Sequence, residues 1–444
     1  MRDLLLVGFL FVAIYFSFKR PYLGVAAWVW IALTAPADWT FGFSQAFRLN
    51  LTIVLVTFIS YMFSKSKGDF KFTNIHFWVL FFGFWMLVST MFNLRIDSEY
   101  AWSKMIEFIK VLALFVFITL TVRKRLHVDT VIWAIVLSIS SFAAMEAFKF
   151  VVSGGGYRIV GKAGIIADRN DLAVAINMCL PLVLYLWSTT KEKKLKLVLL
   201  GFAFLNVVAI VGTYSRGGFI GLLILAFAMW LRSKRKIMYF MLALMSLPVL
   251  YVNAPQEWKD RQSTVEHAST EDGSFIGRLW AWKIATLIAL DYPITGGGFK
   301  ATTDPLLWQT YAPETPNFGP IETPKIPIFE TPKAAHNIYF QVLGSSGFVG
   351  LFVFLMMLWA ALSSCLRNAA KAKKNKVKWC QDLSNAIALS FIGYGVTGLN
   401  VSLAYFELVY AFLALIAVIK GRELYAQSEN DEKLDALNTK PKSV

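Results

Sequence analysis

The chain has 444 residues and is 57% hydrophobic and 16% aromatic, with a mean hydropathy of +0.55. Soluble domains usually contain about 45 to 50% apolar residues, so this composition excludes a single water-soluble core. The formal net charge is +16, but lysine and arginine gather in short connections between apolar runs, which is typical of cytoplasmic loops and not of a nucleic-acid-binding surface. These basic connections contain Lys65, Lys67 and Lys71, Arg123 to Arg125, Lys191 to Lys196, Arg232 to Lys236, and Arg367 to Lys378.

Apolar runs of about 15 to 20 residues recur from the N-terminus to Ile419, and this is the length that a hydrocarbon core requires of a helix. We predict an all-α, polytopic membrane protein with about twelve transmembrane helices, twelve or thirteen. Two short runs within 4–36 are split by Lys19, Arg20 and Pro21. The N-terminus lies outside if this break is cytoplasmic, and inside if the first pair is re-entrant. The later predicted helices are 49–63, 75–93, 104–121, 128–151, 171–188, 197–213, 218–231, 237–253, 337–364, 380–398 and 402–419.

One long connection, 254–335, separates the N-terminal transmembrane helices (1–253) from the C-terminal ones (336–419). It carries seven Lys or Arg against ten Asp or Glu, so we place it on the outer side. Its segment 275–290 has apolar residues at helical spacing and predicts an amphipathic helix at the membrane interface. The segment 311–332 has six prolines and predicts an extended lid or strap. The charged tail 420–444 is expected to be disordered and cytoplasmic.

Metal-binding patterns are absent from the sequence. The three cysteines, Cys179, Cys365 and Cys380, are far apart and offer neither zinc spacing nor a disulfide framework. No D-x-D pair of carboxylates occurs in the chain. We therefore expect no metal and no cofactor.

Two glycine-containing connections on the outer side carry basic residues at positions where they are uncommon. The first, 154–170, could be only a turn, but basic residues there run against the positive-inside bias and favour a function. The second is the hinge Tyr214–Gly218, which is too short to place Arg216 far from the membrane. An arginine near the membrane is costly unless it is paired or functional, although it could simply snorkel at a helix end. The polar residues of the first connection are Arg158, Lys162, Asp168, Arg169 and Asn170.

Arg278 and His336 are the two further candidates on the outer side. Arg278 lies in the amphipathic segment, where a polar position alone would be unremarkable. His336 precedes the point where the chain re-enters the membrane, and such a histidine could be a structural cap. A neutral imidazole is nevertheless the side chain best suited to take a proton from a hydroxyl near pH 7. Guanidinium groups bind phosphate in bidentate fashion and can stabilise a pyrophosphate leaving group without a metal.

Four short motifs in this order around one long loop resemble the O-antigen ligase and polymerase superfamily, closest to the O-glycosylation ligases associated with exosortase systems. The D-R-N-D-L-A stretch that begins at Asp168 adds to the likeness. The family often has glutamate after the glycine of L-G-x-x-G, but here Ser345 follows Gly344, so no carboxylate role is assumed there. The four motifs are S-R-G-G at 215–218, G-R-L-x-x-W at 277–282, P-x-x-G-x-G at 293–298 and A-H-N-x-Y at 335–339.

The resemblance implies a GT-C-like glycosyltransferase of the bacterial inner membrane, whose active site faces the periplasm on the side of the long loop. It implies a glycan donor linked to undecaprenyl pyrophosphate, an acceptor hydroxyl on lipid A core or on a protein, and no nucleic acid partner. The essential residues of the family would fall on Arg216, Arg278 and His336. We further expect contacts to the pyrophosphate and glycan from Arg158, Lys162, Arg169, Tyr214, Asn337 and Tyr339.

Three functions stay open at the level of the sequence. A ligase transfers a finished glycan, a polymerase joins one lipid-linked repeat to another, and a transporter moves a lipid or solute without forming a bond. Few ionisable residues occur in the central parts of the predicted helices, which disfavours a transport path at the membrane midplane. The residues favour a metal-independent, inverting transfer at the outer face, with the ligase as the closer resemblance.

Overall fold

The computed structural model describes residues 2–64, 70–162, 164–232, 236, 273–315 and 323–427. Within these ranges every regular element is a helix and no strand occurs. The helix predicted at 237–253 and the first part of the long connection, 254–272, lie outside the described residues.

The N-terminal half forms nine α-helices among the described residues, and their bounds follow the predicted runs closely. The break between the first two is where it was predicted, because Arg20 is extended and Pro21 occupies the first helical position. α5 begins six residues before the predicted start, because the Asp97 carboxylate accepts the backbone N–H of Tyr100 (3.0 Å) and caps the helix. The helices are α1 Arg2–Lys19, α2 Pro21–Thr34, α3 Leu49–Phe63, α4 Asn74–Met91, α5 Ser98–Thr121, α6 Arg125–Val152, α7 Arg169–Thr189, α8 Lys193–Gly212 and α9 Arg216–Arg232.

Five of the described helices are long and apolar enough to cross a membrane, namely α4, α6, α7, α8 and α14. Three shorter apolar helices, α2, α3 and most of α9, accompany them. The structure therefore supports an all-α membrane protein, while the predicted count of about twelve crossings stays a prediction.

α14 (Ile338–Lys374) is kinked where it packs against a turn of the long connection. Ser346 and Gly347 leave helical geometry, and Gly347 has a φ of 66°. The Gly297 N–H donates to the Gly344 carbonyl (2.9 Å), and the Phe348 N–H donates to the Pro293 carbonyl (2.8 Å). A Cβ atom on Gly296 would lie 2.5 Å from the Gly347 nitrogen. The P-x-x-G-x-G motif is thus a backbone-to-backbone contact that only glycine permits.

α15 (Lys378–Thr397) and α16 (Glu407–Gly421) complete the core, and most of their residues are buried. The last helix was predicted from 402 but starts at Glu407, because residues 398–406 form a loop fixed by side chains. In this loop the Ala404 N–H donates to the Gln341 amide oxygen (3.1 Å), and the Tyr394 hydroxyl donates to the Leu403 carbonyl (2.9 Å). Such bonds are invisible to hydropathy.

The tail was predicted to be disordered from Lys420 onward, but its first residues are ordered. A short helix, η7 (Leu424–Ala426), follows α16, and Leu424 is fully buried. The Lys371 ammonium donates to the Tyr425 hydroxyl (3.2 Å), and the Asn375 amide donates to the Tyr425 carbonyl (3.1 Å). Residues 428–444 lie outside the described part of the chain.

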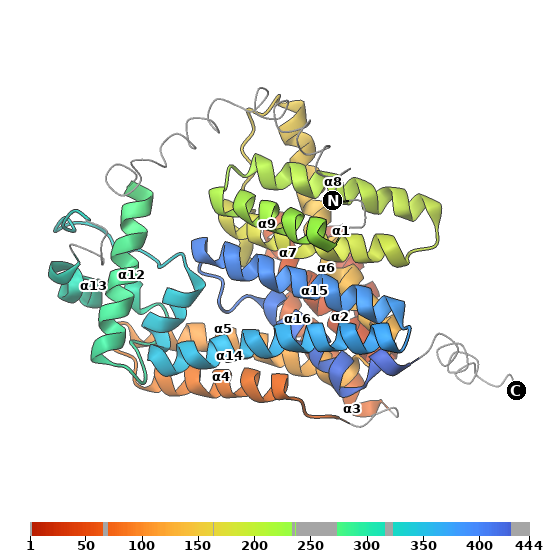
Figure 1. The fold of residues 1–444 in the computed structure, drawn as a ribbon, viewed down its shortest axis with the longest axis horizontal. Coiled ribbons are helices and arrows are strands. Elements are labelled where there is room, and N and C mark those ends of the chain that lie inside the picture. The colour runs from red at the N-terminus through yellow and green to blue at the C-terminus, as the bar shows by residue number, and fades with distance from the viewer. Residues whose placement is uncertain are drawn as a thin grey trace, which may run out of the picture.

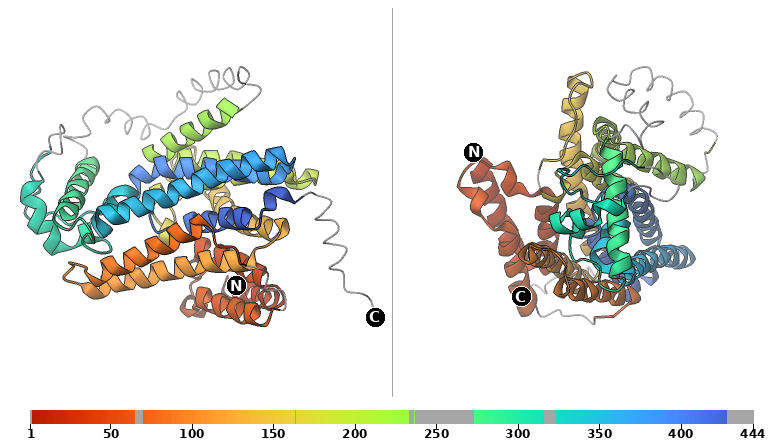
Figure 2. Two further views of the ribbon diagram at one scale, coloured as in Figure 1. Left: turned by 60° about the horizontal axis from the view of Figure 1, so that its bottom comes forward. Right: turned by 90° about the vertical axis from the view of Figure 1, so that its left-hand side faces the viewer.

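The long connection contributes α12 (Gly273–Asp291) and α13 (Pro305–Tyr311), which lie together at one end of the bundle (Figures 1 and 2). α12 confirms the helix predicted at 275–290, and its apolar face packs on α14 and α13. α13 was not predicted. The proline-rich segment predicted to be extended, 311–332, is helical at its start, where α13 ends at Tyr311 and a short helix, η5 (Ala312–Glu314), follows. Residues 323–332 contain no helix, and the Trp280 indole N–H donates to the Pro324 carbonyl there (2.9 Å).

Basic connections lie at the end of the bundle opposite to α12 and α13. Arg125 lies over the Trp379 ring at 5.3 Å, so the loops before α6 and before α15 meet there. α14 has 37 residues, a length of about 55 Å, which separates its basic C-terminus from His336. Arg2 lies at the end of the bundle that carries the 154–170 connection, because it and Lys162 both approach Trp39. The N-terminus and that connection therefore lie on the same side of the bundle, and the side of the membrane on which they lie stays a prediction.

Candidate functional site

The candidate site lies where the N-termini of α7, α9 and α14 converge on the loop that follows α15. The Ser215 hydroxyl donates to the Asn170 amide oxygen (2.7 Å), which joins the start of α9 to the start of α7. The His336 N–H donates to the Ser402 hydroxyl (3.0 Å), which joins the start of α14 to the 398–406 loop. Helix N-termini carry partial positive charge, so their convergence favours an anion.

His336 is held in an unusual backbone conformation and is half-buried. Its φ is 42°, in the left-handed region, and its backbone is fixed by Ser402. Burial lowers the pKa of His336 below its ordinary value, and the positive charge of Arg278 lowers it further. Asp168 acts in the opposite direction and Lys300 in the same direction as Arg278. The ring is therefore neutral near pH 7 and able to accept a proton.

Arg278 is oriented by a residue that sequence reasoning missed. Its Nη1 donates to the Oδ1 of Asn400 at 3.0 Å, across 122 positions of the sequence. Asn400 ends the short helix η6 (Gly398–Asn400) after α15. Nothing in the local sequence marks Asn400, because its role depends on α12 crossing the end of the bundle.

Trp282, one helical turn after Arg278, ties α12 to the segment that carries His336. Its indole N–H donates to the Ala335 carbonyl (2.6 Å), and its ring stacks on Phe340 with a centroid distance of 5.1 Å and an interplanar angle of 4°. Residues four apart lie on one face of a helix. One face of α12 therefore carries both Arg278 and Trp282, and Trp282 holds the residues on either side of His336 in place.

The S-R-G-G hinge adopts a fixed and crowded conformation. The Ser215 hydroxyl accepts the Gly218 N–H (3.1 Å) and so caps α9, which begins at Arg216. A Cβ atom on Gly217 would lie 2.8 Å from Cβ of Asn400. The residue next to Arg216 thus contacts the same asparagine that binds Arg278, and this places both arginine-bearing segments around Asn400.

The connection 154–170 is a tightly packed turn. A Cβ atom on Gly161 would lie 1.7 Å from the Ile166 carbonyl oxygen, and the Ile159 N–H donates to the Gly212 carbonyl (2.9 Å). Asp168 caps α7 by accepting the Asn170 N–H (2.7 Å), and its charge reaches His336. The connection is therefore a packed turn, as one of the two alternatives predicted, and its functional role stays a prediction.

The structure brings some of the predicted site residues together, whereas others form hydrogen bonds within the protein. The charges of Arg278 and Asp168 both act on His336, and Arg216 lies on the hinge next to Asn400. The Tyr214 hydroxyl donates to the Gly155 carbonyl (2.6 Å) and the Tyr339 hydroxyl to the Gly395 carbonyl (2.8 Å). Asn337 caps α14 by accepting the N–H groups of Tyr339 and Phe340. Lys162 lies apart, above the Trp39 ring at 4.9 Å, and the roles expected for Arg158 and Arg169 stay predictions.

Ser345, where the family often has glutamate, lies at the kink of α14 and is buried. Its carbonyl accepts the Gly298 N–H (3.0 Å), so this position joins the glycine turn to α14. Throughout the described residues, no group of three or more His, Cys, Asp or Glu side chains is arranged to hold a metal ion. The cations and helix N-termini are the groups available for binding an anion.

Fold and site define a helical membrane protein with a cationic, histidine-containing site at one end of its bundle. Residues 201–355, which hold the hinge, α12, His336 and the start of α14, match the family described as O-antigen ligase. This match, over about a third of the chain, supports a membrane glycan ligase or polymerase in general, with a lipid-linked glycan donor. Residues 1–191 match a family of unknown function (DUF5935). No curated protein matches the chain.

Proposed function

We propose that this protein is a metal-independent, inverting glycan ligase. It transfers a saccharide from undecaprenyl pyrophosphate to a hydroxyl of lipid A core or of a protein at the periplasmic face of the bacterial inner membrane. The observation that carries the proposal is the placement of Arg278 beside a neutral, half-buried His336, where three helix N-termini converge. A base and an anion-binding site next to each other are what such a transfer needs.

His336 would accept the proton of the acceptor hydroxyl as that oxygen attacks the anomeric carbon. The new carbon–oxygen bond forms on the face opposite the pyrophosphate, and the bond from carbon to the pyrophosphate oxygen breaks. Arg216 and Arg278 would stabilise the charge that develops on the departing pyrophosphate, together with the N-terminal dipoles of α7, α9 and α14. Direct displacement inverts the anomeric configuration and needs no covalent intermediate.

Arg158, Arg169, Tyr214, Asn337 and Tyr339 would line the path of the pyrophosphate and the glycan. The hydroxyls of the two tyrosines already bind backbone carbonyls. We therefore expect them to act on the substrate through the backbone they hold. The likeness to ligases associated with exosortase systems belongs to this proposal, in which the acceptor is lipid A core or a protein.

A polymerase of the same family would use the same leaving-group chemistry. The deciding experiment incubates the purified full chain with a lipid-linked saccharide and candidate acceptors, with and without excess chelator. The linkage at the reducing end of the product then identifies the acceptor. Glycan attached to lipid A core or to protein, undiminished by chelator, is the expected result. Products that contain only longer lipid-linked glycan would identify a polymerase instead, and loss of turnover restored only by a divalent cation would contradict the metal-free step.

A further inference from the structure

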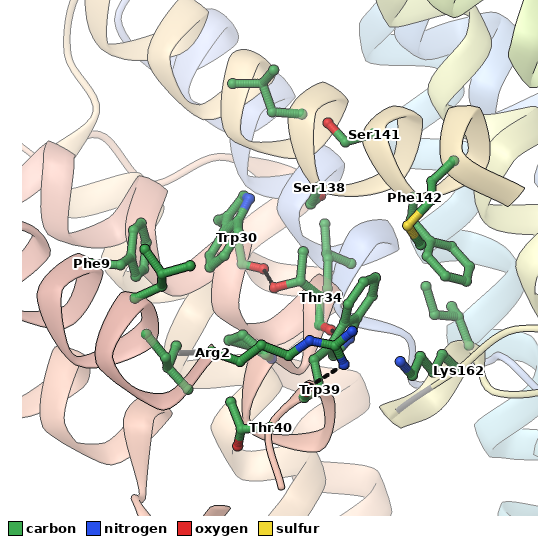
Figure 3. Close-up of a pocket in the computed structure, with 17 residues that line it drawn as sticks. Arg2, Phe9, Trp30, Thr34, Trp39, Thr40, Ser138, Ser141, Phe142 and Lys162 are labelled. Atoms are coloured by element: carbon green, nitrogen blue, oxygen red, sulfur yellow. Dashed lines mark hydrogen bonds between the residues drawn. The ribbon is translucent and has the colours of Figure 1, made fainter. Parts of the chain in front are cut away.

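A cavity of about 530 Å³ lies between α1, α2 and α6, away from the candidate site. Apolar side chains form most of its wall, including Phe9, Trp30 and Phe142 (Figure 3). Its volume falls within the range of about 300 to 1,000 Å³ typical of small-molecule sites. None of Arg216, Arg278, His336 and Asn400 lines it. The cavity is therefore a separate binding space within the described part of the chain.

The wall of the cavity is continuous with the apolar outer surface of the bundle. Leu5 on α1 is 72% exposed, and Leu137 and Met145 on α6 are also exposed, yet all three line the cavity. α6 is long and apolar enough to span a membrane. In a bilayer these side chains face lipid, so the cavity opens toward lipid and not toward water.

The two charged residues that line the cavity are both cations. The guanidinium of Arg2 donates to the Trp39 carbonyl (3.4 Å), and the Lys162 ammonium lies 4.9 Å from the centre of the Trp39 ring. Figure 3 shows the side chains of Arg2 and Lys162 both reaching toward Trp39. The carboxylate next to Arg2, Asp3, accepts hydrogen bonds from the hydroxyl (2.6 Å) and the N–H (3.2 Å) of Ser44. The cationic end of the cavity is thus suited to one phosphate group.

We propose that this cavity binds one anionic phospholipid of the surrounding bilayer, with an acyl chain against Phe9, Trp30 and Phe142 and the phosphate between Arg2 and Lys162. Phospholipids of the bilayer surround this surface and are far more abundant than any lipid-linked glycan. Basic pockets between transmembrane helices select anionic headgroups. The inference goes beyond the proposed function and assigns Lys162 to a lipid site, where it holds the 154–170 connection against α1 and α2.

The test uses the full chain in nanodiscs that contain equal amounts of phosphatidylglycerol and phosphatidylcholine, with bound lipid measured by native mass spectrometry after release. Each cation near a headgroup contributes about a fivefold preference, so the two together give about a 30-fold preference for phosphatidylglycerol. We expect about fivefold in Arg2→Gln or Lys162→Gln, and no preference in the double variant.

A second pair of variants tests the apolar part. Ser141→Trp fills the cavity and should abolish retention of either lipid. Phe148→Trp is the matched control, because Phe148 lies on the same helix, is 68% exposed and does not line the cavity. An unchanged preference in the double variant would overturn the proposal. Displacement of phosphatidylglycerol by undecaprenyl phosphate at equal concentration would also overturn the proposal, because it would indicate that the cavity binds the lipid of the glycan donor. The assay contains no glycan donor or acceptor, so its failure leaves the proposed transfer activity untouched.

Discussion

The side chain of Arg278 donates from Nη1 to Oδ1 of Asn400 at 3.0 Å, and the same asparagine fills the space above Gly217. One neutral residue on the loop after α15 therefore contacts both segments that carry the arginines of the proposed site. An amide oxygen can orient a guanidinium without neutralising its charge, so the bond to Asn400 does not itself cancel the charge of Arg278.

Replacing Asn400 by Ala should weaken donor use about tenfold or more, because hydrogen bonds to charged groups are worth about 1.5 to 3 kcal/mol. Asn400 is a positioning residue, so we expect the loss mainly in KM for the donor, with kcat less affected. Steady-state kinetics at varied donor concentration separates the two. Leu399→Ala, at an exposed neighbouring position, is the control. An equal loss in both variants would mean that the loop matters only for folding.

Arg216→Lys and Arg278→Lys should both lose most transfer at limiting donor. Lysine keeps the positive charge but lacks the planar fork that binds two oxygens at once. Direct donor binding, measured with a lipid-linked saccharide and no acceptor, should fall in parallel. Full activity in either lysine variant would show that the residue supplies only general positive charge.

Gly217→Ala should disturb the site while the matched Gly201→Ala does not. An alanine Cβ at 217 would lie 2.8 Å from the Asn400 side chain, whereas at 201, within α8, no atom lies within 4 Å. Alanine in a helix is favoured over glycine by about 1 kcal/mol, so the control should be as stable as the parent or more stable. Thermal unfolding and transfer rate measured on both variants test this. Equal transfer by the two variants would disprove the crowding at Asn400.

Much of the fold could be predicted from hydropathy, since α3 has the predicted bounds 49–63 and α12 begins within two residues of the predicted segment. The positions that failed depend on tertiary contacts. α16 starts late because Gln341 and Tyr394 hold the loop before it, and the ordered residues after Lys420 depend on Lys371 and Asn375. In the site, motif residues such as Arg278 could be named from sequence, but Asn400 and Ser402 could not, because their partners are distant in the chain.

The topology can be tested by thiol labelling, because Cys179, Cys365 and Cys380 are all buried and should give little background. Phe329 is 95% exposed within the long connection. Phe329→Cys in intact spheroplasts should react with a membrane-impermeant maleimide, since the connection is expected outside. Lys373→Cys, exposed at the far end of α14, should react only after lysis. The reverse pattern would invert the assigned sides.

The fall of the transfer rate at acidic pH should reflect protonation of His336. Burial and the charge of Arg278 lower its pKa, so the neutral, active form persists below the ordinary histidine range. We expect kcat/KM to be flat near pH 7 and to fall only as the pH drops through this lowered pKa. Replacing Arg278 by Gln removes one cause of the depression, so the residual activity of that variant should begin to fall at a higher pH.

Removing the imidazole separates a base from its alternatives. His336→Ala should reduce transfer by about 10² to 10⁴ while donor binding and thermal unfolding stay near the parent values. If His336 were instead a phosphate ligand, the variant would lose donor binding together with transfer. If His336 were a structural cap, the variant would fail to fold. The structural role is a real alternative, because the backbone N–H of His336 donates to the Ser402 hydroxyl and the φ of His336 is 42°. His336→Asn tests that alternative, since asparagine tolerates a positive φ better than alanine and should restore folding without restoring transfer. The stereochemistry of the product completes the argument, because a retained anomeric configuration would require a covalent intermediate and would exclude a single displacement assisted by this base.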